Sequence, residues 1–248
     1  MYLVLTASKD TYITDKIMNS AFRAEDANVG RAGTLDLFKL YSETTLAGTD
    51  NPVELSRALI QFDLYRIREL TSSILDITDP SFKCTLKMKN IAAGQAVPSK
   101  FNLILHPLSQ SWDEGLGRDI GSFGDLDVAN FVTASYSNGT VYPWFLSGAG
   151  RTGLLGSDDI DVIESGSVGS GVQNLFATQY FDTGIEDLTM DVTKIVSATI
   201  TNQLPDKGFR LAFSGTEETD TKTRFVKRFA SRHTANRHLQ PMLHVSFD

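Results

Sequence analysis

The chain has 248 residues, 41% hydrophobic and 21% charged, a composition typical of a globular protein that is large enough to bury a core without metals or disulfides. Its formal net charge of -7 disfavours a nucleic-acid partner, because an acidic surface repels a polyanion. The sequence contains no apolar run that approaches the length of a membrane span, so we expect no membrane insertion.

Short runs with alternating apolar and polar residues occur along most of the chain and are typical of β-strands. They cover residues 2–5, 10–13, 34–41, 56–62, 82–88, 101–108, 208–213, 223–230 and 242–247. Gly, Pro, Asn and Asp clusters separate them, which favours one all-β domain over residues 1–248, a jelly-roll β-sandwich. The period-2 register places these side chains in the core: Phe62, Leu86, Leu103, Leu105, Leu211, Phe213, Val226 and Leu243.

Helical periodicity is confined to two short stretches. Residues 191–200 place Val192, Ile195 and Val196 on one face of a predicted helix. A further helical turn is expected after Asp63.

The stretch from residue 112 to residue 184 differs from the rest because it is rich in Gly, Ser, Asp and Asn with interleaved aromatic residues. Flexible linkers lack such apolar anchors, so we predict a long, ordered insertion between core strands. Insertions of this length in a compact domain are usually functional.

Several short motifs follow one another in a recognisable order. They are 10–13, Asn28 to Gly30, 57–64, Trp112 to Glu114, 191–193, Gly208-Phe209, 229–232 and 241–243. This pattern resembles the DNRLRE domain, a jelly-roll family related to carbohydrate-binding modules, and it spans nearly the whole chain. The resemblance implies structural roles for Asp10, Asn28, Gly30, Arg57, Asp63, Trp112, Glu114, Ser231 and Arg232.

Two features depart from the family pattern. His233 follows Arg232 where the family commonly has an acidic residue, and the glycine-rich middle is larger than in a minimal module. We expect Arg57 and Arg232 to be structural, pairing with Asp10 or Asp63 across strand ends.

The sequence as a whole is also similar to virion structural proteins of marine tailed phages. That similarity implies a protein made in the host cytoplasm and located in the virion, in the tail, neck, baseplate or capsid surface. The N-terminal residues 1–6 carry no signal-peptide pattern, which agrees with this expectation. The expected partners are other virion proteins and copies of the chain itself. The alternative function is a carbohydrate-binding module for host surface glycans.

Tyr142, Trp144 and Phe145 form the clearest aromatic cluster. Three interpretations remain open for it. The rings bury against the sandwich, they form a stacking platform for sugars, or they anchor a contact between subunits.

We expect no catalytic activity. The chain has no Gly-x-Ser-x-Gly elbow, and the acidic pair Asp113 and Glu114 is more typical of a structural corner beside Trp112 than of a glycosidase. No cofactor is expected. A structural calcium ion is an alternative, with Asp10, Asp26, Asn28 and Asp63 as candidate ligands.

The only dense basic run lies between Lys222 and Arg232. Strand alternation places Arg224 and Arg228 on one face and Lys227 on the other. This run is interpreted as a solvated strand face, with a phosphate or partner site as the alternative.

Overall fold

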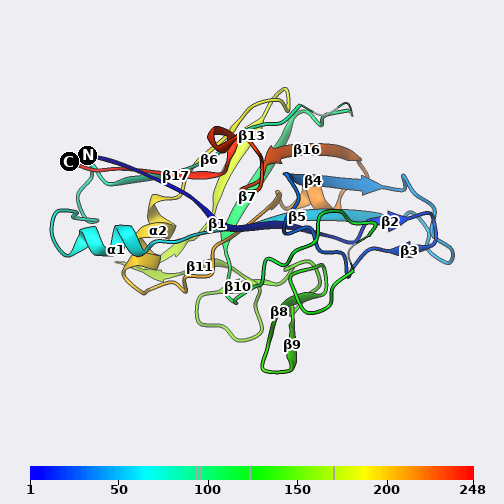
Figure 1. Ribbon diagram of the computed structural model, residues 1–248, viewed down its shortest axis with the longest axis horizontal. Helices are drawn as coiled ribbons and strands as arrows, with labels where there is room; N and C mark the ends of the chain where they lie inside the picture. Colours follow the sequence, from blue (N-terminus) through cyan, green and yellow to red (C-terminus); the bar gives the residue numbers. More distant parts are fainter. Residues whose placement is uncertain (93, 95, 123, 170) are drawn as a thin grey trace.

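The computed structural model describes residues 1–92, 94, 96–122, 124–169 and 171–248, and it confirms an all-β fold. Antiparallel strands form a large sheet that curls into a nearly closed sandwich (Figure 1). Along this sheet the order is β13 (Ala177–Phe181), β7 (Phe101–Pro107), β15 (Phe209–Phe213), β5 (Val53–Phe62), β1 (Tyr2–Thr14), β17 (Met242–Ser246), β6 (Lys83–Met88) and β14 (Leu188–Asp191).

The remaining strands extend or decorate this sheet. Strand β4 (Thr34–Tyr41) pairs with β5 and with β16 (Arg224–Ala230). Three smaller sheets lie outside the main one. The first contains β10 (Thr152–Leu154), β11 (Val162–Val168) and β12 (Gly171–Asn174). The second contains β2 (Ile17–Met18) and β3 (Phe22–Arg23), and the third contains β8 (Thr133–Ser137) and β9 (Thr140–Pro143). Strand β13 lies in the main sheet, so the segment outside that sheet ends before Ala177, short of the expected residue 184.

A glutamine side chain links the two end strands of the main sheet. Gln179 on β13 donates from Nε2 to the carbonyl of Asp187 at 2.9 Å and accepts at Oε1 from the Thr189 backbone N–H at 2.6 Å. The amide thus replaces the backbone pairing that β13 would need in order to join β14. This contact draws the ends of the sheet together.

The main core follows the period-2 pattern of the strands. Of the predicted core residues, all but one are buried: Phe62, Leu86, Leu103, Leu105, Leu211, Phe213 and Leu243. The prediction for Val226 was wrong, because it is only half-buried. The pairing of β16 with β4 shifts register between Arg224 and Lys227, and this irregularity turns Lys227 inward in place of its neighbour.

A second, smaller core lies on the other side of the sheet. Ile13 on β1 and Leu59 on β5 are covered there by residues that follow β7, among them Trp112, Trp144 and Val162. The segment from residue 108 to residue 162 is therefore a packed layer on this sheet face.

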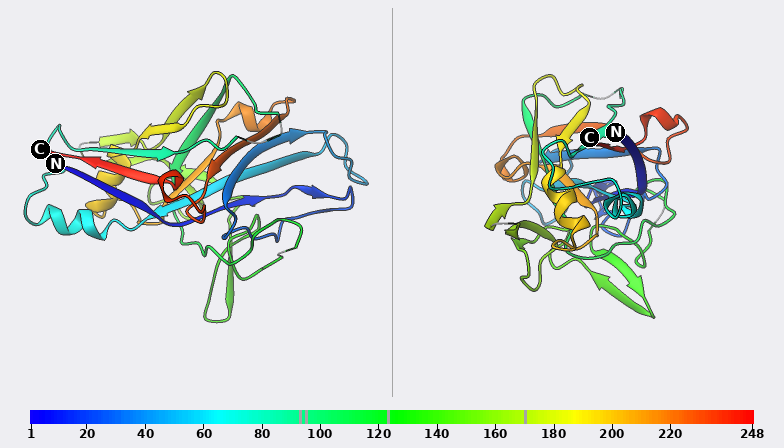
Figure 2. Two further views of the ribbon diagram at one scale, coloured as in Figure 1. Left: turned by 45° about the horizontal axis from the view of Figure 1, so that its top comes forward. Right: turned by 90° about the vertical axis from the view of Figure 1, so that its left-hand side faces the viewer.

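The helical predictions are confirmed. Helix α2 (Thr193–Ile200) buries Ile195 and Val196, and α1 (Tyr65–Thr71) buries Ile67. Two shorter helical turns are α3 (Thr216–Thr219) and η1 (Arg237–Leu239). The chain termini lie side by side, and the Phe247 N–H donates to the Met1 carbonyl at 3.1 Å (Figure 2).

Within the described part of the chain, no helix has both the length and the apolar character needed to cross a membrane.

Replacing Gln179 by leucine should reduce the free energy of unfolding by about 1–2 kcal/mol, since the Asp187 carbonyl and the Thr189 N–H lose their partner. Chemical denaturation provides the measurement. Thr178→Ala, at the neighbouring exposed position of the same strand, is the control and should change stability little. Equal losses in the two variants would mean that the link between β13 and β14 contributes nothing.

Candidate functional site

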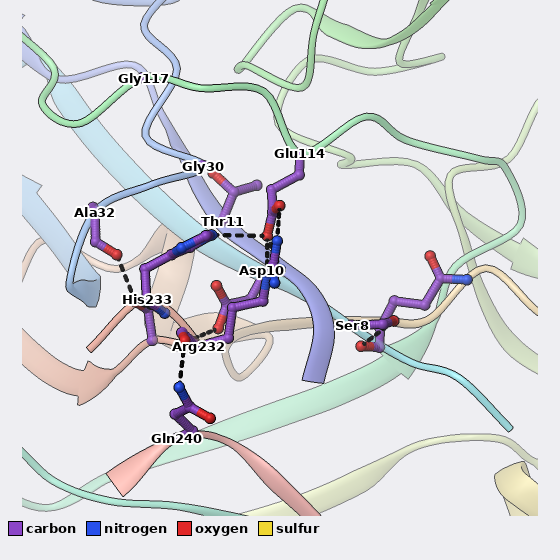
Figure 3. Close-up of polar contacts among 12 residues, drawn as sticks. Ser8, Asp10, Thr11, Gly30, Ala32, Glu114, Gly117, Arg232, His233 and Gln240 are labelled. Carbon is purple, nitrogen blue, oxygen red and sulfur yellow. Dashed lines mark hydrogen bonds and ion pairs between the residues drawn. The ribbon is translucent and has the colours of Figure 1, made fainter. Parts of the chain in front are cut away.

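Most of the residues to which the resemblance gives structural roles, but not Arg57 or Asp63, lie around one mostly buried carboxylate, that of Glu114. Its Oε1 accepts the Asp10 backbone N–H at 2.8 Å and Arg232 Nε at 2.6 Å, while its Oε2 accepts Arg232 Nη2 at 2.5 Å (Figure 3). Ser231 Oγ donates to the Ala32 carbonyl at 2.5 Å. We call Asp10, Asn28, Glu114, Ser231 and Arg232 the Glu114 cluster.

Asn28 connects this cluster to the loop that follows Trp112. Its Nδ2 donates to the carbonyls of Glu114 and Ala129 at 2.9 and 2.8 Å, and its Oδ1 accepts the Gly117 N–H at 2.8 Å. The backbones meet too closely for side chains, because a Cβ on Gly30 would lie 1.9 Å from the Glu114 carbonyl oxygen. Glycine is therefore required at position 30.

Asp10 is a buried member of the cluster whose carboxylate is only partly hydrogen-bonded. Its Oδ2 accepts the Arg232 backbone N–H at 2.6 Å, whereas its buried Oδ1 has no hydrogen-bond partner among the described residues. Burial raises the pKa of Asp10 to about 7, against the opposing effect of the Arg232 N–H. The cluster thus holds a carboxyl group that titrates near neutral pH.

Two neighbours of the cluster were missed by the sequence reasoning. Lys9 Nζ donates to the Trp112 carbonyl at 2.8 Å and lies 5.0 Å from the centre of the Trp112 ring. His233 Nε2 lies 3.6 Å from Glu114 Oε1, and burial together with Arg232 lowers the pKa of this histidine. No sequence pattern indicated a role for Lys9. His233 was noted only as a departure from the family pattern.

Trp112 has the structural role expected of it. Its side chain is fully buried in the second core, and its indole N–H donates to the Lys207 carbonyl at 3.0 Å.

The expected partners of the two arginines need correction. The guanidinium of Arg232 pairs with Glu114, and only its backbone reaches Asp10. Arg57 pairs with Glu218, with Nη2 2.7 Å from Oε2 and Nε 2.9 Å from Oε1. Both arginines face acids distant in sequence, which strand patterns cannot identify. Asp63 is exposed and accepts the Tyr65 N–H at the start of α1.

The aromatic cluster divides between the interior and the surface. Trp144 is buried in the second core, and its indole N–H donates to the Asn130 carbonyl at 2.9 Å. The side chains of Tyr142 and Phe145 are 48% and 49% exposed. One ring therefore anchors the layer, and two are available to a ligand or partner.

Tyr142 belongs to a hairpin that projects away from the sandwich, as Figures 1 and 2 show. Tyr136 on β8 lies opposite Val141 on β9, and Ser135 lies opposite Tyr142. Because side chains alternate along strands, Tyr136 and Val141 share one face and Tyr142 lies on the other. All three are exposed, so both hairpin faces present apolar side chains to solvent.

Two acids, one half-buried and one buried, hold the backbone of β8 and of the segment that follows β9. Asp113 accepts the Tyr136 N–H at Oδ2, at 3.0 Å. Asp161 is fully buried and accepts backbone N–H groups from Phe145, Leu146 and Arg151 at 2.8–3.0 Å. The hairpin therefore extends from an ordered base.

The basic side chains Arg224, Lys227 and Arg228 are bound by protein groups rather than forming a solvated face. Arg224 pairs with Asp220 at 2.9 Å, and Arg228 pairs with Asp36. Lys227 is fully buried and donates to the carbonyls of Gly184 and Glu186 at 2.8 and 2.7 Å. The interpretation of a solvated face was wrong for these three residues.

The candidate calcium ligands do not form one group. Asp10 Oδ2 and the Asn28 amide are hydrogen-bonded to protein groups, Asp10 Oδ1 has no partner among the described residues, and Asp63 accepts the Tyr65 N–H. In the part of the chain that the structure describes, no three His, Cys, Asp or Glu side chains are placed to hold a metal ion.

Comparison of the sequence with models of protein families gives no match, and neither does comparison with curated proteins.

Removal of the Arg232 side chain should lower the free energy of unfolding by about 2–4 kcal/mol, since it leaves the mostly buried Glu114 carboxylate without its cation. Thermal and chemical denaturation of Arg232→Ala measure this loss. Arg237→Ala removes an exposed arginine nearby and should be close to neutral. Full stability of Arg232→Ala, together with loss of a binding activity, would assign this arginine to function.

Asp10→Asn should remove part of the pH dependence of stability. The pKa of Asp10 is raised in the folded state to about 7, above about 4 for an unfolded aspartate, so the folded protein binds this proton more tightly. That stabilisation is fully present below about pH 4 and is lost as the pH rises through 7. The free-energy difference between wild type and Asp10→Asn should therefore fall by up to about 4 kcal/mol over this range.

Denaturation curves at closely spaced pH values measure the difference, with Asp50→Asn on an exposed loop as the control. A difference that grows with pH would mean that Arg232 keeps Asp10 ionised in the folded protein.

Proposed function

We propose that the chain is a structural component of a tailed-phage particle and acts by protein–protein assembly. The similarity of the sequence as a whole to virion structural proteins of marine tailed phages supports the phage setting. The all-β fold agrees with that resemblance. The expected partners are other virion proteins and further copies of this chain.

The observation that carries the assembly role is the exposed hairpin. Tyr136, Val141 and Tyr142 are 42–48% exposed, and Phe145 and Leu146 beyond the hairpin are equally exposed or more so. We call these five residues the hairpin patch. Exposed apolar groups that lie together favour a contact site, since most of the gain in such contacts comes from burying aromatic anchors.

The backbone of the hairpin adds to this argument. Strand β9 pairs only with β8 among the described strands, so its outer edge is open. A two-stranded hairpin is marginally stable by itself, and an open edge can accept a further strand. A neighbouring protein can therefore bind through both side chains and backbone.

A carbohydrate-binding role is the second candidate because two rings, Tyr142 and Phe145, are exposed. Aromatic rings stack on the apolar faces of sugars. Against this role, Trp144 between them is buried, so the platform lacks the ring that would join the two.

A large deletion within the insertion, for example of residues 139–171, would damage the fold and so could not test the assembly role. It would remove Trp144, Ala149 and Val162 from the second core, and with them the buried Asp161. Point substitutions in the hairpin patch avoid this damage.

The triple variant Tyr136→Ser, Val141→Thr, Tyr142→Ser should fold normally yet lose most of its incorporation into phage particles. Mass spectrometry of purified particles measures incorporation, and thermal unfolding verifies the fold. The matched control Tyr65→Ser, Ile74→Thr, Leu126→Ser removes three exposed apolar side chains elsewhere and should incorporate normally.

Normal incorporation of the hairpin variant with loss of adsorption to host cells would favour the glycan-binding role. Normal incorporation with normal adsorption would contradict both roles for the hairpin patch.

A further inference from the structure

A polar cavity of about 240 Å³ lies beside the second core, apart from the Glu114 cluster. Its floor is the outer face of β5, β7 and β15, and the backbone around Gly150 borders it. Six of its lining residues have polar side chains: Arg57, His106, Thr152, Glu164, Arg210 and Glu218. We call it the Arg210 cavity.

The two arginines of this cavity are not equivalent. Arg57 is neutralised by the bidentate contact with Glu218 and also donates to the Gly148 carbonyl at 2.6 Å. Arg210 has no carboxylate within 4.0 Å among the described residues, although its side chain is almost fully buried. A buried cation without a paired anion costs stability.

The hydrogen bonds of Arg210 are also incomplete. Its Nη1 donates to the Ala149 carbonyl at 2.7 Å, and its Nη2 lies 3.3 Å from His106 Nδ1. Its buried Nε has no partner among the described residues. Arg210 thus keeps one unpaired donor, Nε, on a guanidinium whose fork geometry matches a carboxylate.

The neighbouring acids act on Arg210 only through space, since none of them forms an ion pair with it among the described residues. Burial and then Arg210 lower the pKa of His106 to about 3, so this ring is neutral near pH 7. Burial, followed by the proximity of Arg57, lowers the pKa of Arg210 to about 10, which leaves it charged. Glu218 and then Asp161 favour the charged form of Arg210. However, Glu218 is paired with Arg57, and the oxygens of Asp161 accept hydrogen bonds from backbone N–H groups and from Gln110.

Glu164 is the remaining acid of the lining, and it is exposed on β11. Water screens an exposed carboxylate, so its effect on the buried guanidinium is weak. It would, however, repel an anion that enters the cavity.

We propose that the Arg210 cavity binds a small monocarboxylate anion, with the carboxylate beside the Arg210 guanidinium. A single negative charge matches the one arginine that lacks a paired acid. The planar carboxylate fits the planar guanidinium, and Ile104 in the lining provides apolar contact for a short alkyl group. A phosphate dianion fits less well, because Glu164 and Glu218 would both repel its second charge.

The test uses acetate as the probe, titrated against wild type at constant ionic strength with chloride as the replaced anion. Thermal unfolding should show a midpoint that rises with acetate by at least about 2 °C at saturation. The side-chain Nε–H resonance of Arg210 should shift along the same titration. Phosphate at equal ionic strength should produce neither effect.

Two lining substitutions should act in opposite directions. Arg210→Gln should abolish the acetate-dependent rise, whereas Glu164→Gln should lower the dissociation constant for acetate by about two- to fivefold, since it removes a like charge. Arg66→Gln, which removes an exposed arginine of α1, should bind acetate like wild type. Glu164 is exposed, so its variant keeps the test valid even if Arg210→Gln does not fold.

An acetate effect that survives Arg210→Gln would overturn the proposal. So would an Arg210 Nε–H resonance that does not respond to acetate, or weaker acetate binding by Glu164→Gln. Equal effects of phosphate and acetate would show a general anion effect and would also overturn it.

Discussion

The mostly buried carboxylate of Glu114 joins three parts of the chain that are far apart in sequence. It accepts hydrogen bonds from the Asp10 backbone on β1 and from the guanidinium of Arg232, which follows β16. The carbonyl of the same residue accepts from Asn28. A buried acid is stable only when its oxygens are satisfied, so the positions of these segments depend on one another.

This constraint determines how the layer after β7 lies on the sheet. Glu114 is two residues beyond Trp112, whose ring is buried with Ile13, Leu59 and Trp144 in the second core. The Asp161 carboxylate accepts hydrogen bonds from the backbone on both sides of residue 148 and so holds that backbone against this layer. With the base held in this way, the hairpin patch stays exposed and the Arg210 cavity stays open beneath the loop.

The strands and helices could be predicted because burial on one face produces a regular pattern in sequence. Residues 34–41 match β4 in full, and the register error at Val226 arose because period-2 alternation takes no account of a bulge. The buried Lys227 was missed for a similar reason. Its ammonium group is stabilised by the ring of Phe229 on the same strand, and by carbonyls near Gly184 and the ring of Phe181, which are distant in sequence.

The resemblance identified most members of the Glu114 cluster but not their pairing. It also gave Arg57 a structural role, whereas the acid that pairs with Arg57 lies in α3, outside the recognised motifs. Exposure of Tyr142 and burial of Trp144 depend on how the layer packs. No local pattern distinguishes them, because both belong to one aromatic run.

Native-state hydrogen exchange of Glu114→Gln compared with wild type tests most directly whether this carboxylate holds the layer on the sheet. The account predicts a selective loss of protection at the amides of Asp10, Gly30, Gly117 and Arg232, with the paired amides of β7 and β15 unchanged. Unchanged protection at those four amides, or an equal loss throughout the main sheet, would contradict it.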